Sequence, residues 1–199
     1  MRIVRPSIAV CAILVCLNTS APPASAPLGL SSQAANVTQT TPLILEKDEG
    51  ERRVVRGWPG HPDPGETFIL KVDPKNGGSS HLVFMTADIS RGGAIDAHRH
   101  PAADEILFLE SGTARVHLGD TARVVHGGST VFIPANTWIS VDNIGNEAIR
   151  AVAVFSAPGF EDFMRETSVL EGEKNVPLTK AENDAAEKKH SHAVIYKEP

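Results

Sequence analysis

The 199-residue sequence is poor in cysteine and in aromatic residues. Its two cysteines, Cys11 and Cys16, lie near the start, so the rest of the chain has no thiol for a disulfide bond or a metal ion. Acidic residues outnumber lysine and arginine by 24 to 19, and the basic residues form no cluster. This charge balance argues against nucleic acid and anionic membranes as partners.

Long hydrophobic runs are also missing. The unbroken apolar run over residues 8–17 is about half as long as the roughly 20 residues that a membrane-spanning helix needs. Arg2 and Arg5 precede this run, and Ala24-Ser25-Ala26 follows it as a small-residue cleavage site. This pattern predicts a signal peptide over residues 1–26 and export to the periplasm or outside the cell, with no membrane attachment after cleavage.

Residues 27–42 lack a sustained apolar period, and we expect a flexible lead-in there. Over residues 43–158, short apolar runs alternate with turn residues, which predicts an all-β domain in the form of an antiparallel sandwich or barrel. The expected strands are residues 52–56, 67–72, 81–89, 105–110, 114–118, 122–126, 130–133, 138–142 and 148–155.

The pattern changes over residues 159–199, where we expect a helical extension that packs on the barrel. Phe160, Phe163 and Met164 have helical spacing, which predicts a short helix with one apolar face. Thr179 and Glu182 have the spacing of a capping box at the start of a second, polar helix. Residues 193–196 could form a final strand.

The segment from Gly92 to Glu105 carries the strongest chemical signal. On a strand, residues two apart share a face, so His98 and His100 would point the same way. Pro101 ends this strand, and a new strand beginning at Glu105 can bring a carboxylate opposite the histidines. Two imidazole nitrogens and one carboxylate suit Fe(II), Mn(II), Zn(II), Ni(II) or Cu(II) and leave coordination positions open.

The spacing of this segment resembles the first motif of the cupin superfamily at every position, through Gly92, His98, His100, Glu105 and Gly112. The resemblance implies a double-stranded β-helix, or jelly-roll barrel, and a divalent metal ion held by His98, His100 and Glu105.

The second cupin motif is matched only in part. Gly128, Pro134 and Asn143 fit it, but Asn136 replaces a glycine and Ile139 replaces the histidine that is the fourth ligand. Asparagine tolerates the left-handed conformation, whereas isoleucine has no lone pair to offer a metal. Either the site works with three protein ligands or it is degenerate.

Several apolar residues share strand parity with Glu105, and by resemblance to cupins we expect them to line a cavity around the metal, although they could simply fill the barrel. These residues are Leu107, Leu109, Val131, Ile133, Ile139 and Val141. His81, His117 and His126 stand alone on predicted strands and are not assigned to the site.

The sequence resembles small one-barrel cupins that are grouped with quercetin dioxygenases. The resemblance implies dioxygenase-like oxidoreductase chemistry on a small organic substrate, and a homodimer. The alternative is a cupin that binds a small ligand or a metal without turnover, as Ile139 suggests. Isomerase chemistry ranks third, because it needs an inward acid or base and Tyr196, the single tyrosine, is expected in the tail.

Overall fold

The computed structural model describes residues 40–58 and 66–197. The predicted signal peptide, and all but the last three residues of the predicted lead-in, lie outside this part of the chain. Two helices are found in the described part, and neither is long and apolar enough to cross a membrane.

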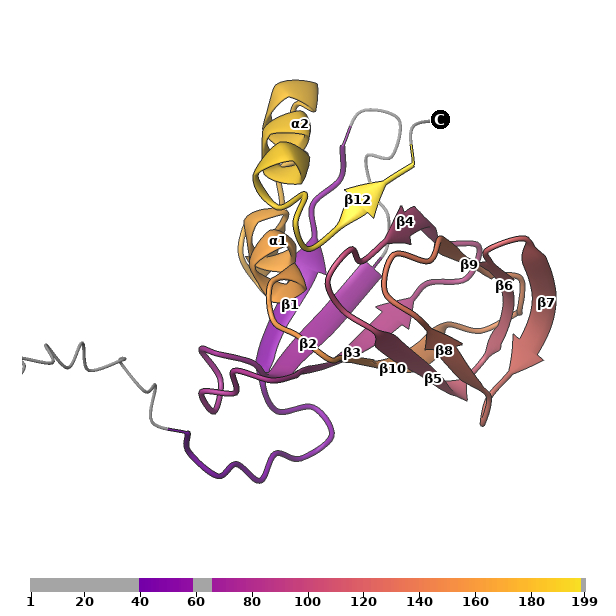
Figure 1. Ribbon diagram of the computed structural model, residues 1–199, viewed down its shortest axis with the longest axis horizontal. Coiled ribbons are helices and arrows are strands. Elements are labelled where there is room, and N and C mark those ends of the chain that lie inside the picture. Colours follow the sequence, from indigo (N-terminus) through magenta and orange to yellow (C-terminus); the bar gives the residue numbers. More distant parts are fainter. Residues whose placement is uncertain (1–39, 59–65, 198–199) are drawn as a thin grey trace, which may run out of the picture. The chain divides into compact units, whose positions relative to one another are not determined.

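In the described residues, twelve strands form two sheets, and all the named strand pairs are antiparallel (Figure 1). The seven-stranded sheet has the order β11 (Ser168–Leu170), β1 (Glu51–Val55), β2 (Glu66–Val72), β3 (Val83–Ile89), β10 (Ile149–Phe155), β5 (Glu105–Ser111) and β8 (Thr130–Ile133). The five-stranded sheet has the order β12 (Ile195–Tyr196), β4 (Ala94–Arg99), β9 (Ile139–Asn143), β6 (Thr113–Leu118) and β7 (Thr121–His126). The predicted jelly-roll fold is confirmed.

The core lies between the inner faces of the two sheets. Strand β10 shows the pattern most clearly, because Ile149, Ala151, Ala153 and Phe155 are buried while the residues between them are half-buried. This alternation is expected where successive side chains point to opposite faces of a sheet. The inward residues of β5 and β9 belong to the same hydrophobic cluster. The strand that begins with Glu105 and the strand that begins with Ile139 therefore share one continuous core.

Three residues of the two cupin-like motifs, Gly112, Asn136 and Asn143, stabilise the turns between the strands around the candidate metal site. Gly112 has a φ of 92°, and a Cβ atom there would come within 2.9 Å of the Ile149 Cα, so a side chain does not fit. Asn136, which replaces the glycine of the second motif, adopts a φ of 65° and so takes the left-handed conformation expected of it. The buried Asn143 amide donates hydrogen bonds to the carbonyls of Ile89 and Glu147, which ties the end of β9 to the end of β3 and to the turn before β10.

The C-terminal part contributes helices and strands. Helix α1 (Phe160–Glu166) follows the barrel, and helix α2 (Lys180–Lys189) begins with the predicted capping box between Thr179 and Glu182. Strand β11 pairs with β1, and β12 pairs with β4, so each sheet gains one strand from this part. Strand β11 was not predicted, because its three residues are too few to show a period. Figure 1 shows α1, α2 and β12 gathered at one end of the described structure.

A group of paired charges holds α1 against β1 and the end of β2; we call Glu51, Arg53, Asp73 and Arg165 the paired cluster. One Arg165 nitrogen lies 2.7 Å from a Glu51 oxygen and 2.7 Å from an Asp73 oxygen. Arg53 adds a second contact of 2.7 Å to Glu51. Asp73 is fully buried, and each charge in the cluster faces an opposite one.

Candidate metal centre

The three predicted ligands come together at the junction of β4 and β5. His98 is the penultimate residue of β4, His100 follows the strand, and Glu105 opens β5. All three are buried, with exposed fractions of 6%, 2% and 6%. One ligand atom from each residue can be chosen so that all three atoms lie within 4.8 Å of one another. The sequence therefore brings together two imidazoles and a carboxyl group, as predicted.

Hydrogen bonds fix the orientation of both imidazole rings. The Nδ1 atom of His98 lies 2.8 Å from the backbone carbonyl of Asp96, and the Nδ1 atom of His100 lies 2.9 Å from the carbonyl of Ala193. A carbonyl can only accept, so each Nδ1 carries the proton and each Nε2 keeps its lone pair. Metal-ligating histidines show this arrangement, with one nitrogen held by a backbone or carboxylate partner and the other directed to the ion.

The pKa shifts keep the metal-free site uncharged. Burial raises the pKa of Glu105 to about 8. Burial, and then the nearby His98, lowers the pKa of His100 to about 3. Burial also lowers the pKa of His98, against the opposing effect of its bond to Asp96. At neutral pH the histidines are neutral and Glu105 holds a proton, since burial disfavours the charged form of each group.

Two polar atoms of the site are buried and have no hydrogen-bond partner. These are the Nε2 atom of His100 and one carboxyl oxygen of Glu105, which lie 3.6 Å apart. Their contact is not an ion pair, because the histidine is neutral. Unsatisfied buried polar atoms are costly and uncommon in native proteins. A divalent cation would satisfy both atoms and displace the Glu105 proton, so the residues present fit a metal ion.

Ile139 occupies the place expected of the missing fourth ligand. It lies on β9, directly opposite His98 in the pairing of β4 with β9, and is 2% exposed. Its side chain offers the centre an apolar wall and no donor atom. Within the described residues, no cysteine, acid or other histidine joins the group of three.

A cavity of about 1060 Å³ opens beside this centre, and His98 and Glu105 lie on its wall. Of the six apolar residues predicted to line a cavity, Leu107, Ile139 and Val141 do so. Leu109 and Ile133 are packed in the core, where they fill the barrel. Val131 also belongs to the core and borders a second space of about 320 Å³. The alternation of side chains along a strand shows which residues point inwards, but it does not show how deep in the barrel each of them lies.

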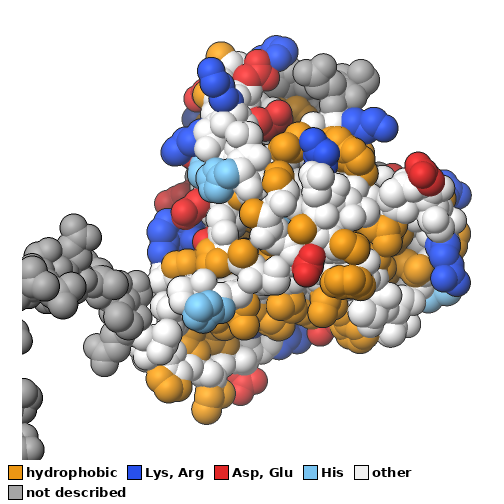
Figure 2. Space-filling model, in the orientation of Figure 1, with side chains coloured by type: hydrophobic (Ala, Val, Ile, Leu, Met, Phe, Trp, Pro, Cys, Tyr) orange, Lys and Arg blue, Asp and Glu red, His pale blue; other side chains and the backbone are white. Residues whose placement is uncertain are grey.

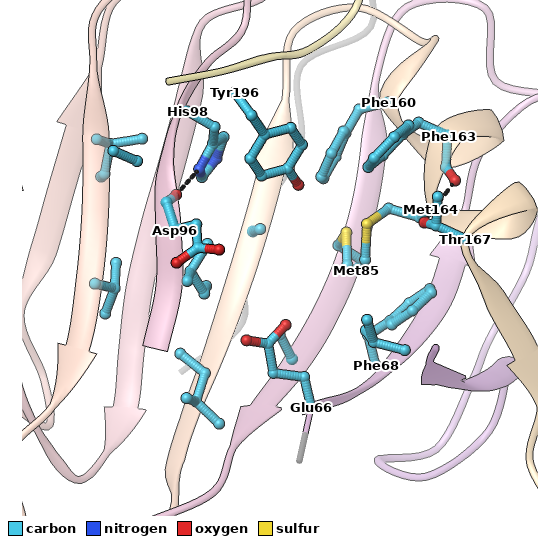
Figure 3. Close-up of a pocket in the computed structure, with 18 of the residues that line it drawn as sticks. Glu66, Phe68, Met85, Asp96, His98, Phe160, Phe163, Met164, Thr167 and Tyr196 are labelled. Carbon is cyan, nitrogen blue, oxygen red and sulfur yellow. Dashed lines mark hydrogen bonds between the residues drawn. The ribbon is translucent and has the colours of Figure 1, made fainter. Parts of the chain in front are cut away.

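The cavity wall also holds acidic and aromatic residues that the sequence analysis did not select. Glu66 of β2 and Asp96 of β4 line it, and Figure 3 shows both carboxyl groups turned towards the same space. Burial, and then the negative charge of Asp96, raises the pKa of Glu66 to about 8. Neither residue belongs to a motif, and only the strand pattern could have suggested that they face inwards.

Tyr196 was expected in the tail, away from the site, and this prediction was wrong. Strand β12 brings it opposite His98 in the β4 pairing, with the two ring centroids 5.6 Å apart. Burial, and then the charge of Glu66, raises the pKa of the phenol, which therefore stays protonated. Phe160 and Phe163 lie beyond it on the same wall (Figure 3). His81, His117 and His126 are exposed and lie outside the group of three.

Comparison with known proteins shows that one region of the chain resembles a known family. Residues 85–155 match the family model described as "Cupin domain". The uncharacterised protein YrkC of Bacillus subtilis is 27% identical over 84 residues, which cover 39% of this chain and 45% of YrkC. An uncharacterised protein of Streptomyces coelicolor is 35% identical over 66 residues, covering 33% of this chain and 62% of that protein. The matched region thus spans less than two thirds of either relative.

Among solved structures, KdgF from a Halomonas species aligns with a TM-score of 0.45 and 18% identity, covering 50% of this chain and 87% of that one. The family match includes the ligand segment in full, from β3 before Gly92 to β10 after Asn143. Residues 85–155 therefore form a cupin domain, and the three candidate ligands lie within it.

Proposed function

We propose that this protein binds a divalent metal ion through His98, His100 and Glu105 and uses it for oxidoreductase chemistry of the dioxygenase type on a small organic substrate. The observation that carries the proposal is the pair of buried atoms without partners, Nε2 of His100 and an oxygen of Glu105. Three protein ligands would leave coordination positions for oxygen and substrate, as in other sites with two histidines and one carboxylate. A metal bound there would supply the redox or Lewis-acid chemistry.

The remaining groups of the cavity would bind and orient the substrate. The wall is largely apolar and aromatic, with Phe68, Met85 and Phe160 on one side, so an organic molecule would be held by burial and ring contacts. Glu66, Asp96 and the Tyr196 hydroxyl are among the polar groups that face this space (Figure 3). With a pKa near 8, Glu66 can hold or release a proton close to neutral pH.

A cupin that binds a ligand without turnover is the second candidate, and Ile139 is the observation that favours it. This apolar side chain stands opposite His98, where a fourth ligand would complete the coordination. A three-ligand site should bind metal more weakly than a four-ligand site.

The first experiment is elemental mass spectrometry on the chain expressed from residue 27, with Glu105→Gln and His98→Ala as site variants. His117→Ala is the matched control, because His117 is an exposed strand histidine outside the site. We expect near-stoichiometric metal in the wild type and the control, and none in the site variants. Folded wild-type protein that takes up no divalent ion would overturn the metal site.

Oxygen uptake with a panel of phenolic substrates then separates the two candidate functions. Turnover that requires bound metal, and that disappears in Glu105→Gln, supports the dioxygenase proposal. Saturable binding of a panel compound by metal-loaded protein, with no oxygen consumed, supports the binding protein instead.

We also propose that the protein forms a homodimer through the outer face of β5 and β8. Ile106, Phe108 and Phe132 are more than one third exposed on these strands, and Ile106 is paired with Phe132. Figure 2 shows hydrophobic side chains gathered over this part of the molecule. Sedimentation should give a dimer that Phe132→Lys converts to a monomer; a wild-type monomer at micromolar concentration contradicts the proposal.

Export remains a proposal that rests on residues 1–26. Expression of the full chain in a Gram-negative host, followed by N-terminal sequencing of the protein in the periplasmic fraction, tests it. We expect the recovered chain to begin near residue 27, and an uncleaved cytoplasmic product would argue against the signal peptide.

A further inference from the structure

The C-terminal segment reaches back into the candidate metal centre. Residues 193–197, which we call the strap, follow helix α2 and run along β4. The backbone N–H of Lys197 donates to the carbonyl of Ala97 at 2.8 Å, and Tyr196 lies opposite His98. The strap is therefore the outermost strand of the five-stranded sheet, next to the strand that carries His98.

One contact of the strap determines which nitrogen of His100 is free. The carbonyl of Ala193 accepts the hydrogen bond from Nδ1 of His100 at 2.9 Å, and both residues are buried. Without this acceptor, nothing in the described structure would keep the proton on Nδ1. A neutral imidazole that moved its proton to Nε2 would point a donor at the metal position and could no longer ligate there.

His98 provides an internal contrast. Its Nδ1 atom is held by the carbonyl of Asp96, two residues away on the same strand. The orientation of His98 is thus set locally by β4, whereas that of His100 depends on a residue 93 positions further along the chain. The two ligands differ in what holds them, although they differ little in burial.

The strap is held in place by its own small core. Val194 is 1% exposed and packs with Phe163 of α1 and Ala186 of α2. Tyr196 contacts Phe163 as well, with ring centroids 5.7 Å apart. The Tyr196 ring therefore contacts Phe163 of α1 as well as the ligand His98. Gly159 approaches closely enough that a Cβ atom there would lie 3.1 Å from the Ala193 Cβ. These contacts hold the Ala193 carbonyl within hydrogen-bonding distance of the His100 Nδ1 atom.

We propose that the strap is a positioning element of the metal centre, in which the Ala193 carbonyl selects the metal-binding tautomer of His100 and Tyr196 closes the cavity beside His98. The proposal rests on the proposed metal site. It assigns a role to a segment that lies beyond the matched cupin region, which ends at residue 155. It predicts that loss of the strap affects the two histidine ligands unequally.

Nitrogen-15 NMR of the imidazole rings in metal-free protein tests this directly, because the two ring nitrogens have different shifts in each tautomer. In the wild type, both histidines should carry the proton on Nδ1. In a chain ending at His192, or in Val194→Asp, which places a charge in the strap's core, His100 should become a mixture of tautomers while His98 stays unchanged. A chain ending at Lys197 is the matched control and should behave as the wild type.

Metal affinity gives the second measurement, by competition with a chelating dye for Zn(II) or Mn(II). Loss of a partner that orients a ligating histidine costs about 10–100-fold in affinity, and we expect a loss of this size in the two strap variants. A wild-type His100 that carries its proton on Nε2 overturns the proposal even if the variants fail to fold. Folded strap variants with wild-type tautomers and affinity overturn it too. Correct tautomers in a wild type that binds no metal would instead reject only the metal site.

Discussion

Two of the places where the protein buries ionisable side chains, the paired cluster and the candidate metal centre, treat charge in opposite ways. In the paired cluster, burial raises the pKa of Glu51 but is outweighed by Arg165 and Arg53, so the pKa falls below its usual value. At the candidate metal centre, burial acts unopposed on Glu105, and the pKa rises to about 8. The first region pairs its charges within the chain, whereas the second leaves the Nε2 atom of His100 and one oxygen of Glu105 without a hydrogen-bond partner.

The acids of the two regions differ in their partners, although the Nη1 atom of Arg165 in the paired cluster also lacks a hydrogen bond. Each acid of the paired cluster has a cation within 2.7 Å. The centre at His100 and Glu105 has two buried atoms without any partner. Groups that serve only stability are generally satisfied, whereas perturbed and unsatisfied groups tend to cluster at functional sites.

The largest effect should follow from breaking the paired cluster. Arg165→Leu removes the cation that faces both Glu51 and the fully buried Asp73. Removing one partner of a buried pair costs about 3–5 kcal/mol, because the other charge stays buried. Urea denaturation at pH 7 should show a loss of this size. A change below about 1 kcal/mol would mean that the cluster is not what holds α1 to the sheet.

The stability of the protein should rise when a metal ion is added to the metal centre, but it should change little when Glu105 is replaced in the metal-free protein. Glu105→Gln replaces a carboxyl group that is protonated at neutral pH in the metal-free protein, so its stability without metal should change little. A ligand present at 100 times its Kd stabilises a folded protein by about 2.7 kcal/mol. We expect thermal unfolding to show stabilisation of this order in the wild type with Mn(II) or Zn(II), and none in the variant.

The dependence of stability on pH should have opposite signs at Glu66, which lines the cavity beside the metal centre, and at Glu51 of the paired cluster. Below about pH 4.5 Glu66 is protonated in both the folded and unfolded chain; between about 4.5 and 8 only the folded chain keeps the proton. The contribution of Glu66 therefore falls as pH rises through this window, with a slope below about 1.4 kcal/mol per pH unit. Relative to wild type, Glu66→Gln should gain stability as pH rises.

Glu51 provides the opposite case. Its folded pKa is lowered, so its contribution is present above pH 4.5 and is lost as the pH falls through the folded value. The stability cost of Glu51→Gln should therefore shrink in acid. Urea midpoints of the two variants between pH 3 and 8 check both signs, and parallel curves for the two variants would contradict the distinction.

The smallest effect should come from an exposed pair, which belongs to neither region. Lys180 lies 2.6 Å from Asp184 on α2, with both side chains more than half exposed. Surface pairs of this kind contribute about 0–1 kcal/mol. Lys180→Ala should stay within that range in urea denaturation, and a larger loss would show that contact distance alone can mislead.

The strand spacing and the motif residues were enough to predict the fold and the three clustered side chains. Alternation is a local signal, so β10 and β5 could be predicted from short windows, and the spacing from Gly92 to Gly112 set the positions of both histidines and Glu105. The left-handed conformation of Asn136 followed from its side-chain chemistry.

What the sequence could not show depends on contacts between distant residues. Glu66 is one acid among 24, and nothing near it in the sequence marks it as facing a cavity. The place of Tyr196 could not be predicted, because β12 has only two residues and its partner β4 lies almost 100 positions earlier. Parity alone could not separate Leu107 on the cavity wall from Leu109 in the core, because both point inwards.

The bond between His100 and Ala193 also bears on when the centre can form during biosynthesis. At about 5–20 residues per second, a ribosome needs roughly 5 to 20 seconds to add the 93 residues between the ligand and its acceptor. The metal-binding geometry therefore cannot be completed before the strap has been synthesised. If the chain is exported unfolded, the ion would be acquired at the destination, and the metals available there would decide which one is bound.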